Sequence, residues 1–321
     1  MSTTAHLSTP QRPSTHPLRG YIYIAASAAF WALSATLGKL VFSGRLVEGT
    51  ATLTPLDPVI LSQARTTMSL LVLAPILLMR GGRAALAMPR TQILKCLILG
   101  TLGVAASNFF YYFAISQTSV SVAIIVQYTA PVWVLLYMVT RRLQAPTPKR
   151  VSAVILAVIG ITLAIGLIGQ RDVRINWTGV MAAFAAALSF AFWNVFGHGL
   201  VTAYSRWKVL FYALLGSAIF WAVINPPWKI FAAHYSRGQW LFLVAFAFVS
   251  MLIPFSFYLS GLRHLDATRA VVTSCLEPVF TVIMAALFIG EGLSPWQVVG
   301  MALVLVATVV IQLPEQRSQP A

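Results

Sequence analysis

The chain has 321 residues, of which 59% are hydrophobic and only 9% are charged, with a net charge of +15 and a mean hydropathy of +0.82. Soluble domains usually carry about 25% charged residues, so this composition excludes an ordinary soluble protein. The positive charge does not indicate nucleic-acid binding, because the Lys and Arg residues lie in short segments between apolar runs, which is the pattern of membrane topology. We predict an all-α polytopic membrane protein that contacts the lipid bilayer and no nucleic acid.

Ten apolar runs are long enough to cross a bilayer core, which takes about 20 helical residues. They are flanked by a polar segment at 1–19 and another at 314–321, which we expect to be disordered cytoplasmic tails. The predicted spans are 20–42, 58–79, 92–115, 119–139, 149–169, 177–200, 207–225, 239–261, 267–289 and 295–313.

The distribution of Lys and Arg predicts the orientation. With the N-terminus inside, 14 basic residues lie inside and 5 outside, which places both termini in the cytoplasm by the positive-inside rule. The inside set is Arg12, Arg19, Arg80, Arg83, Arg90, Arg141, Arg142, Lys149, Arg150, Arg206, Lys208, Arg263, Arg269 and Arg317, and the outside set is Arg45, Arg171, Arg174, Lys229 and Arg237.

The second half of the chain repeats the first. At a constant offset of 147, Tyr111 aligns with Tyr258, Pro131 with Pro278, and Thr147-Pro148 with Ser294-Pro295. Such self-similarity indicates an internal duplication. Equivalent loops carry opposite charge signals, as expected if five crossings invert the second copy. We therefore predict two inverted five-helix repeats, at 20–169 and 177–313, an architecture typical of secondary transporters.

A carboxylate interrupts the ninth apolar run. Glu277 is followed by Pro278, which has no N–H and frees the carbonyl of Ser274, as Pro131 frees that of Gln127 in the fourth span. An ionisable residue in a membrane span indicates a functional site. Glu277 is predicted to bind a cationic group or a proton. The alternative is a structural ion pair with Arg65 or Lys39.

Other polar and aromatic side chains share helix faces that can line a central path. Trp31 and Trp193 occupy equivalent repeat positions at an offset of 162 and are predicted to form aromatic walls, with packing as the alternative role. For the amides, interhelical hydrogen bonding is the alternative. The predicted substrate-binding residues are Trp31, Ser34, Asn108, Tyr112, Gln127, Trp193, Asn194, Tyr258, Ser274 and Glu277.

Some features argue against other functions. The chain has no GxxxxGK[ST], HExxH or GxSxG motif. We therefore predict no catalytic residues, no cofactor and no metal site. Cys96 and Cys275 fall inside predicted spans and are expected to be buried, inert thiols. For Arg65 and Lys39 we expect side chains that extend towards water at the membrane surface, with a substrate role as the alternative.

The sequence resembles EamA-type members of the drug/metabolite transporter superfamily. The residues that carry the resemblance are Trp31, Lys39, Arg65, Tyr112-Phe113-Ala114-Ile115, Thr118-Ser119, Pro131-Val132, Glu277-Pro278-Val279, Gly290-Glu291, Gln297 and Gly300. The family usually has a Glu where this chain has Gln144.

The resemblance implies a secondary transporter of the bacterial inner membrane, similar to bacterial amino-acid and metabolite exporters. Its substrate would be a small neutral or zwitterionic metabolite, and protons are a possible coupling ion. The oligomeric state is open, and a monomer is sufficient. Two other classes stay open: a lipid-modifying membrane enzyme that uses Glu277 and His198, and a non-transporting subunit.

Overall fold

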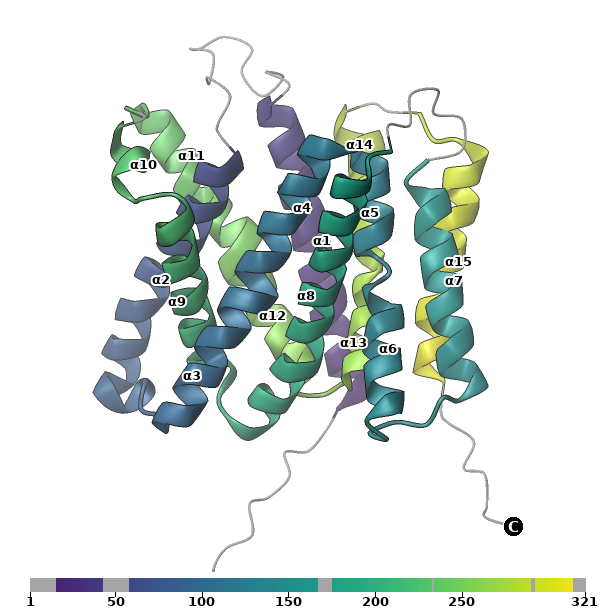
Figure 1. Ribbon diagram of the computed structural model, residues 1–321, viewed down its shortest axis with the longest axis horizontal. Helices are drawn as coiled ribbons and strands as arrows, with labels where there is room; N and C mark the ends of the chain where they lie inside the picture. The colour runs from purple at the N-terminus through teal and green to yellow at the C-terminus, as the bar shows by residue number, and fades with distance from the viewer. Residues whose placement is uncertain (1–15, 43–57, 167–174, 233, 290–291, 314–321) are drawn as a thin grey trace, which may run out of the picture.

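The computed structural model describes residues 16–42, 58–166, 175–232, 234–289 and 292–313. These residues form helices and no strand (Figure 1). The α-helices are α1 (Pro17–Phe42), α2 (Pro58–Gly81), α3 (Arg90–Ile98), α4 (Ala106–Gln117), α5 (Val120–Gln127), α6 (Ala130–Thr140), α7 (Pro148–Ala164), α8 (Trp177–Ala203), α9 (Arg206–Ile224), α10 (Trp228–Ala232), α11 (Arg237–Ala247), α12 (Ile253–Leu262), α13 (Ala267–Ser274), α14 (Leu276–Ile289) and α15 (Pro295–Gln312). Short helices η1 (Gly82–Ala85), η2 (Leu99–Ala105) and η3 (Phe248–Leu252) connect some of them.

Nine segments of the described chain are long and apolar enough to cross a membrane. They coincide with nine of the predicted spans, so the all-α membrane class is confirmed. The predicted fifth span forms α7, whose 17 residues extend about 25 Å at 1.5 Å per residue. Because α7 is shorter than a typical bilayer core, the count of ten spans stays a prediction. Residues 1–15 of the predicted N-terminal tail, the tail at 314–321 and the segment 43–57 between the first two predicted spans lie outside the described residues. The predicted start of the first span at residue 20 is wrong, because α1 already begins at Pro17 and includes the last three residues assigned to the tail.

The helix breaks occur where the prolines predict them. α5 ends at Gln127 and α6 begins at Ala130, while α13 ends at Ser274 and α14 begins at Leu276. The caps follow the same register, since Ser119 and Asp266 cap α5 and α13, and Thr147 and Ser294 cap α7 and α15. Each pair is separated by 147 residues. Each cap accepts a bond from the N–H three residues on, which satisfies one otherwise unpaired helix-end donor.

The two halves of the chain interlock rather than form separate bodies. α1 packs on α12, α13 and α14, whereas α8 packs on α4, α5 and α6. α2 contacts the π-helical η3, and α9 contacts the π-helical η2. Thr101 of η2 donates to the carbonyl of Gly216, and Ser69 of α2 donates to that of Ala247. Gly216 and Ser69 are also 147 residues apart, so equivalent pairs of elements are hydrogen-bonded, although the donor lies on η2 in one pair and on α2 in the other.

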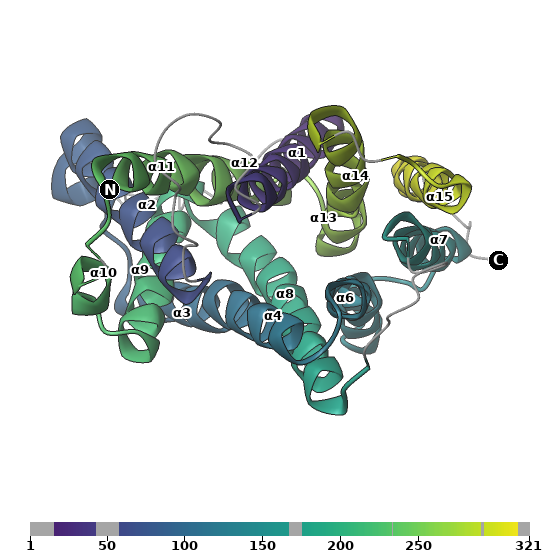
Figure 2. The same ribbon diagram turned by 90° about the horizontal axis from the view of Figure 1, so that it is seen from above.

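α7 and α15 lie side by side at one edge of the bundle (Figures 1 and 2). Gly160 and Gly300 allow their backbones to approach closely, because a Cβ added at Gly300 would meet the nitrogen of Ala164 and the carbonyl of Gly160. Small residues permit such close helix packing in membranes, where van der Waals contact drives association. This pair therefore depends on glycine at both positions.

α1 begins and α15 ends at the same end of the bundle (Figure 1). We call this end the basic end, because the described inside set of Lys and Arg residues lies on the elements that begin or end there. It contains the end of α2, the start of α3, the α6–α7 corner, the start of α9 and the α12–α13 loop. Lys229 and Arg237, on α10 and α11, lie at the opposite end.

Gly300→Ala is expected to lower the free energy of unfolding by about 1–3 kcal/mol, because the new methyl group overpacks the contact with α7. The control is Gly199→Ala in α8, where an added Cβ meets nothing within 4 Å and the helix gains about 0.5–1 kcal/mol. Thermal unfolding of the purified protein in detergent measures both. Equal midpoints for the two variants would contradict the close contact.

Candidate functional site

The carboxyl of Glu277 lies inside the bundle, just after the break between α13 and α14. It hydrogen-bonds the hydroxyl of Tyr128, at the end of α5, and interacts electrostatically with the guanidinium of Arg65 from α2. Tyr111 of α4 and Tyr258 of α12 lie close enough to sense its charge. Side chains from four other elements thus surround Glu277, which faces protein rather than lipid.

Arg65 is buried, with 8% of its surface exposed, and one terminal nitrogen donates to the side-chain oxygen of Asn108. The prediction that Arg65 extends towards water is therefore wrong. Its Nε has no hydrogen-bond partner among the described residues. Asn108 in turn donates to the carbonyl of Val104 at 2.7 Å. A guanidinium with an unused donor thus lies near the Glu277 carboxyl. The side chain of Lys39 lies outside the described residues.

A second polar chain runs through Tyr258. Its hydroxyl donates to the Asn194 Oδ1 at 2.5 Å and interacts with Ser274. Both Asn194 and Tyr258 are completely buried, and the Asn194 amide donates to the Phe190 carbonyl at 2.8 Å. This chain joins α8, α12 and α13, and Tyr258 connects it to the neighbourhood of Glu277.

Aromatic rings pack around Tyr258. The ring centroid of Trp31 lies 5.3 Å from those of Tyr258 and Phe255, and 6.3 Å from that of Phe190. Trp31 and Phe190 keep partial exposure. Trp193 is 1% exposed and packs on Phe255 at 5.4 Å. The two tryptophans therefore contact a common ring, and Trp193 is the more deeply buried one.

The remaining predicted residues have fewer described contacts. Ser34 donates to the Trp31 carbonyl of its own helix, and Tyr112 contacts the ring of Tyr111. Gln127 is half-buried at the end of α5.

Gln144 accepts a hydrogen bond from Thr268 at 2.7 Å, which links the two halves at the basic end. Gly290 and Glu291 lie outside the described residues. The substrate-binding role of all ten predicted residues stays a prediction.

Tyr128 and Phe190 were not among the site residues predicted from the sequence, and the predicted position of Arg65 was wrong. A signal for Arg65 was present, because Ser62, Arg65, Thr66 and Ser69 form one polar stripe with spacings of three and four in an otherwise apolar helix. All four are buried. Tyr128 had a weaker signal, since it lies in the helix break that Pro131 predicts. Phe190 had none.

The sequence also contains two cysteines in predicted spans and His198, which the enzyme alternative would combine with Glu277. Cys96 and Cys275 are free and buried, which confirms their predicted burial.

His198 contacts the carbonyl of Leu262 at 2.8 Å, at the basic end. Nearby His264, in the loop after α12, has a pKa below its usual value because burial and the neighbouring Arg263 disfavour the charged ring. Among the described residues no group of His, Cys, Asp and Glu is arranged to hold a metal ion.

The fold and the buried charged site define a multi-pass membrane protein of the transporter class. The chain belongs to the EamA-like transporter family, whose model matches residues 18–166 and 177–313. An uncharacterized transporter of Archaeoglobus fulgidus is 27% identical over 65% of this chain and 74% of its own length. The threonine/homoserine exporter RhtA of Escherichia coli is 23% identical over 68% of this chain and 71% of its own length.

The fold also matches a crystal structure with a TM-score of 0.72, covering 92% of this chain and 97% of that one at 18% sequence identity. At this identity the likeness shows the fold alone. The family match and this fold match both extend over nearly the whole described chain.

Tyr258→Phe is expected to destabilise the protein by about 1–3 kcal/mol, because it leaves the buried Asn194 Oδ1 without a donor. Tyr23→Phe is the control, since the structure gives the Tyr23 hydroxyl no hydrogen bond among the described residues and the change keeps the ring that stacks on Phe257. Its effect should stay within about 0.5 kcal/mol. Thermal unfolding in detergent compares the two. A Tyr258→Phe midpoint equal to that of Tyr23→Phe would contradict the polar chain.

Proposed function

We propose that this protein is a secondary transporter that exports small zwitterionic or neutral metabolites, amino acids among them, from the bacterial cytoplasm. It works by alternating access, in which two inverted five-helix repeats, 20–169 and 177–313, rock around a central site. Protons binding at Glu277 provide the coupling. The site consists of Glu277, Arg65 and the groups around them.

One observation carries this proposal: a carboxyl and a guanidinium from different helices share one interior site. An amino acid presents an ammonium and a carboxylate a few ångströms apart. Arg65 has a free donor for the carboxylate, and Glu277 offers charge for the ammonium. Charge-assisted bonds of this kind are about twice as strong as neutral ones. A pair of opposite charges suits a zwitterion better than a phosphate ester, which needs several cations.

The surrounding groups fit the same ligand. The partly exposed rings of Trp31 and Phe190 present faces that attract a cationic group. Asn108 holds Arg65 in place, while Tyr128 donates to Glu277 and can release it when a proton or an ammonium binds. The RhtA relative is a threonine/homoserine exporter, which supports the amino-acid class.

The mechanism is supported by the repeated contacts of the two halves. Breaks, caps and π-helical segments recur at one offset, and each half supplies α1–α2 or α8–α9 to the other. Two equivalent packings of this kind are the basis on which inverted repeats exchange access between the two sides. An enzyme that uses Glu277 with His198 fits less well, because Glu277 lies ten residues, or about 15 Å, along the span from the basic end, where His198 lies.

Glu277→Gln is expected to lower amino-acid transport about 10–100-fold and to abolish its response to a pH gradient, because one charge-assisted partner of the ammonium is lost. Arg65→Gln should reduce transport similarly at all pH values. Uptake of labelled threonine and homoserine into proteoliposomes measures this.

The matched control is Thr162→Val in α7, which removes only a hydroxyl bonded to the Val158 carbonyl of its own helix. It should transport like the wild type. Normal pH-dependent transport by Glu277→Gln would make Glu277 structural. If the wild type transported no amino acid and turned over a lipid, the transporter proposal would fail.

The orientation has its own test. A green fluorescent protein fused after the C-terminus should fluoresce, and alkaline phosphatase fused there should be inactive, because the basic end faces the cytoplasm. Phosphatase fused after Asn225, at the opposite end of α9, should be active. The reverse pattern would contradict the orientation.

A further inference from the structure

A groove of about 560 Å³ opens between α2, the start of α9 and the η3–α12 segment. It is distinct from the Glu277 site, since none of the residues that line it contacts that carboxyl. Its walls include Leu73 and Ile76 of α2, and Phe248 and Leu252 of η3. Ile76 is 37% exposed and Met79, which directly precedes Arg80, is 86% exposed. On a membrane helix such side chains face lipid, so the groove opens towards the bilayer.

The polarity of the groove changes along the membrane normal. Leu73, Phe248 and Leu252 belong to the deeper turns of α2 and η3, while Arg80 and Lys208, with Trp207 beside it, lie where α2 ends and α9 begins, at the basic end (Figure 1). An apolar depth with a cationic mouth matches a molecule with a long apolar tail and an anionic head. A small zwitterion has no long apolar tail to pack against the aliphatic residues deep in the groove.

Among the described residues, the cations at the mouth have no carboxylate partner. Of the seven acidic residues in the sequence, only Asp266 and Glu277 are described. Asp266 contacts Arg269 at 3.5 Å and Arg150 at 3.9 Å, and Glu277 lies in the interior. Lys208 donates one bond to the Ala87 carbonyl at 2.7 Å, which leaves its other protons available. The mouth of the groove therefore has uncompensated positive charge within the described chain.

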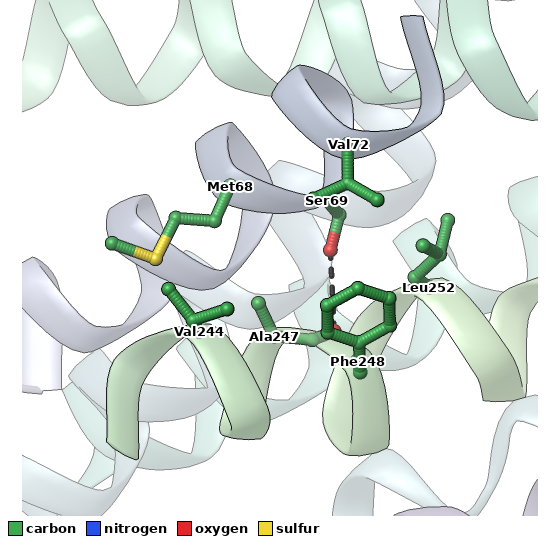
Figure 3. Close-up of a pocket in the computed structure, with 7 residues that line it drawn as sticks. All are labelled: Met68, Ser69, Val72, Val244, Ala247, Phe248 and Leu252. Atoms are coloured by element: carbon green, nitrogen blue, oxygen red, sulfur yellow. Dashed lines mark hydrogen bonds between the residues drawn. The ribbon is translucent and has the colours of Figure 1, made fainter. Parts of the chain in front are cut away.

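The groove also ends within the leaflet. Beyond it, Met68, Ser69 and Val72 of α2 pack directly on Val244 and Ala247 (Figure 3). The gap left there has no room for a water molecule, and Ser69 bonds the Ala247 carbonyl across it at 3.2 Å. A closed apolar end suits an acyl chain and not a solute passing towards Glu277.

We propose that this groove binds one anionic glycerophospholipid from the leaflet at the basic end. The headgroup phosphate lies against Arg80 and Lys208, and an acyl chain lies along Leu73, Phe248 and Leu252. The bound lipid joins α2 of the first half to α9 and α12 of the second. Because α2 is one of the helices exchanged between the halves, the lipid holds an interface on which the bundle depends.

Lipid retention by purified wild type, measured by native mass spectrometry with phosphatidylglycerol and phosphatidylcholine, tests the proposal. One basic residue near an anionic lipid contributes about 1 kcal/mol, which is roughly a fivefold change in affinity. The Arg80→Gln/Lys208→Gln variant should therefore bind phosphatidylglycerol roughly 25-fold more weakly. The matched control is Arg83→Gln/Arg90→Gln, which removes two cations from the same end and none from the groove.

A second variant tests the apolar part. Ser256→Phe places a ring in the groove and removes only a bond to the Ile253 carbonyl of its own helix, so the fold should be kept while lipid retention falls. Phosphatidylglycerol should raise the unfolding midpoint of wild type and control, and not of the two groove variants.

Three results would overturn the proposal. One is equal loss of lipid binding in the control, which would mean general attraction to the basic end. Another is displacement of the lipid by inorganic phosphate, which would indicate a free-anion site. The third is competition by threonine, which would make the groove part of the transport path. Each is independent of whether Glu277 carries transport.

Discussion

A carboxyl group inside a membrane bundle has to be stabilised by protein groups, because lipid offers no hydrogen bonds and an unpaired charge there costs several kcal/mol. Around Glu277 this requirement is met by Tyr128 and by the charge of Arg65. Meeting it brings together helices from both halves of the chain. Arg65 then needs Asn108, and Tyr258 needs Asn194. The acidic side chain at membrane depth and the polar side chains around it therefore form one interior region.

The interlocked halves make this arrangement possible. α2, which carries Arg65, packs on η3 of the second half, while Tyr128 and Asn108 come from the first half and Glu277 from the second. A site formed at such an interface changes whenever one half moves against the other. That property suits alternating access, since the distance between the charges depends on the relative position of the repeats. The groove at Arg80 and Lys208 lies at another part of the same interface.

The helix breaks after Gln127 and Ser274 also contribute to the site around Glu277. Pro131 and Pro278 each remove one backbone donor, and the helix is interrupted within the four residues before each proline. Irregular backbone at membrane depth is tolerated where protein covers it. The break on the first half presents Tyr128, and the break on the second presents Glu277, so the two interruptions meet through a hydrogen bond.

The membrane class, nine of the spans and the two proline breaks could be predicted from the sequence, because they follow from local hydrophobicity and from missing N–H groups within a few residues. The helical spacing also indicated interior faces for Glu277, Asn108 and Tyr258. Which of these faces meet depends on the tertiary packing. Arg65 lies about 10 Å along α2 from its start, a depth from which a long side chain reaches either water or the interior, and packing against α4 turned it inward. The partnership with Tyr128 and the burial of Trp193 were decided in the same way, since helical periodicity specifies a face but not its neighbour.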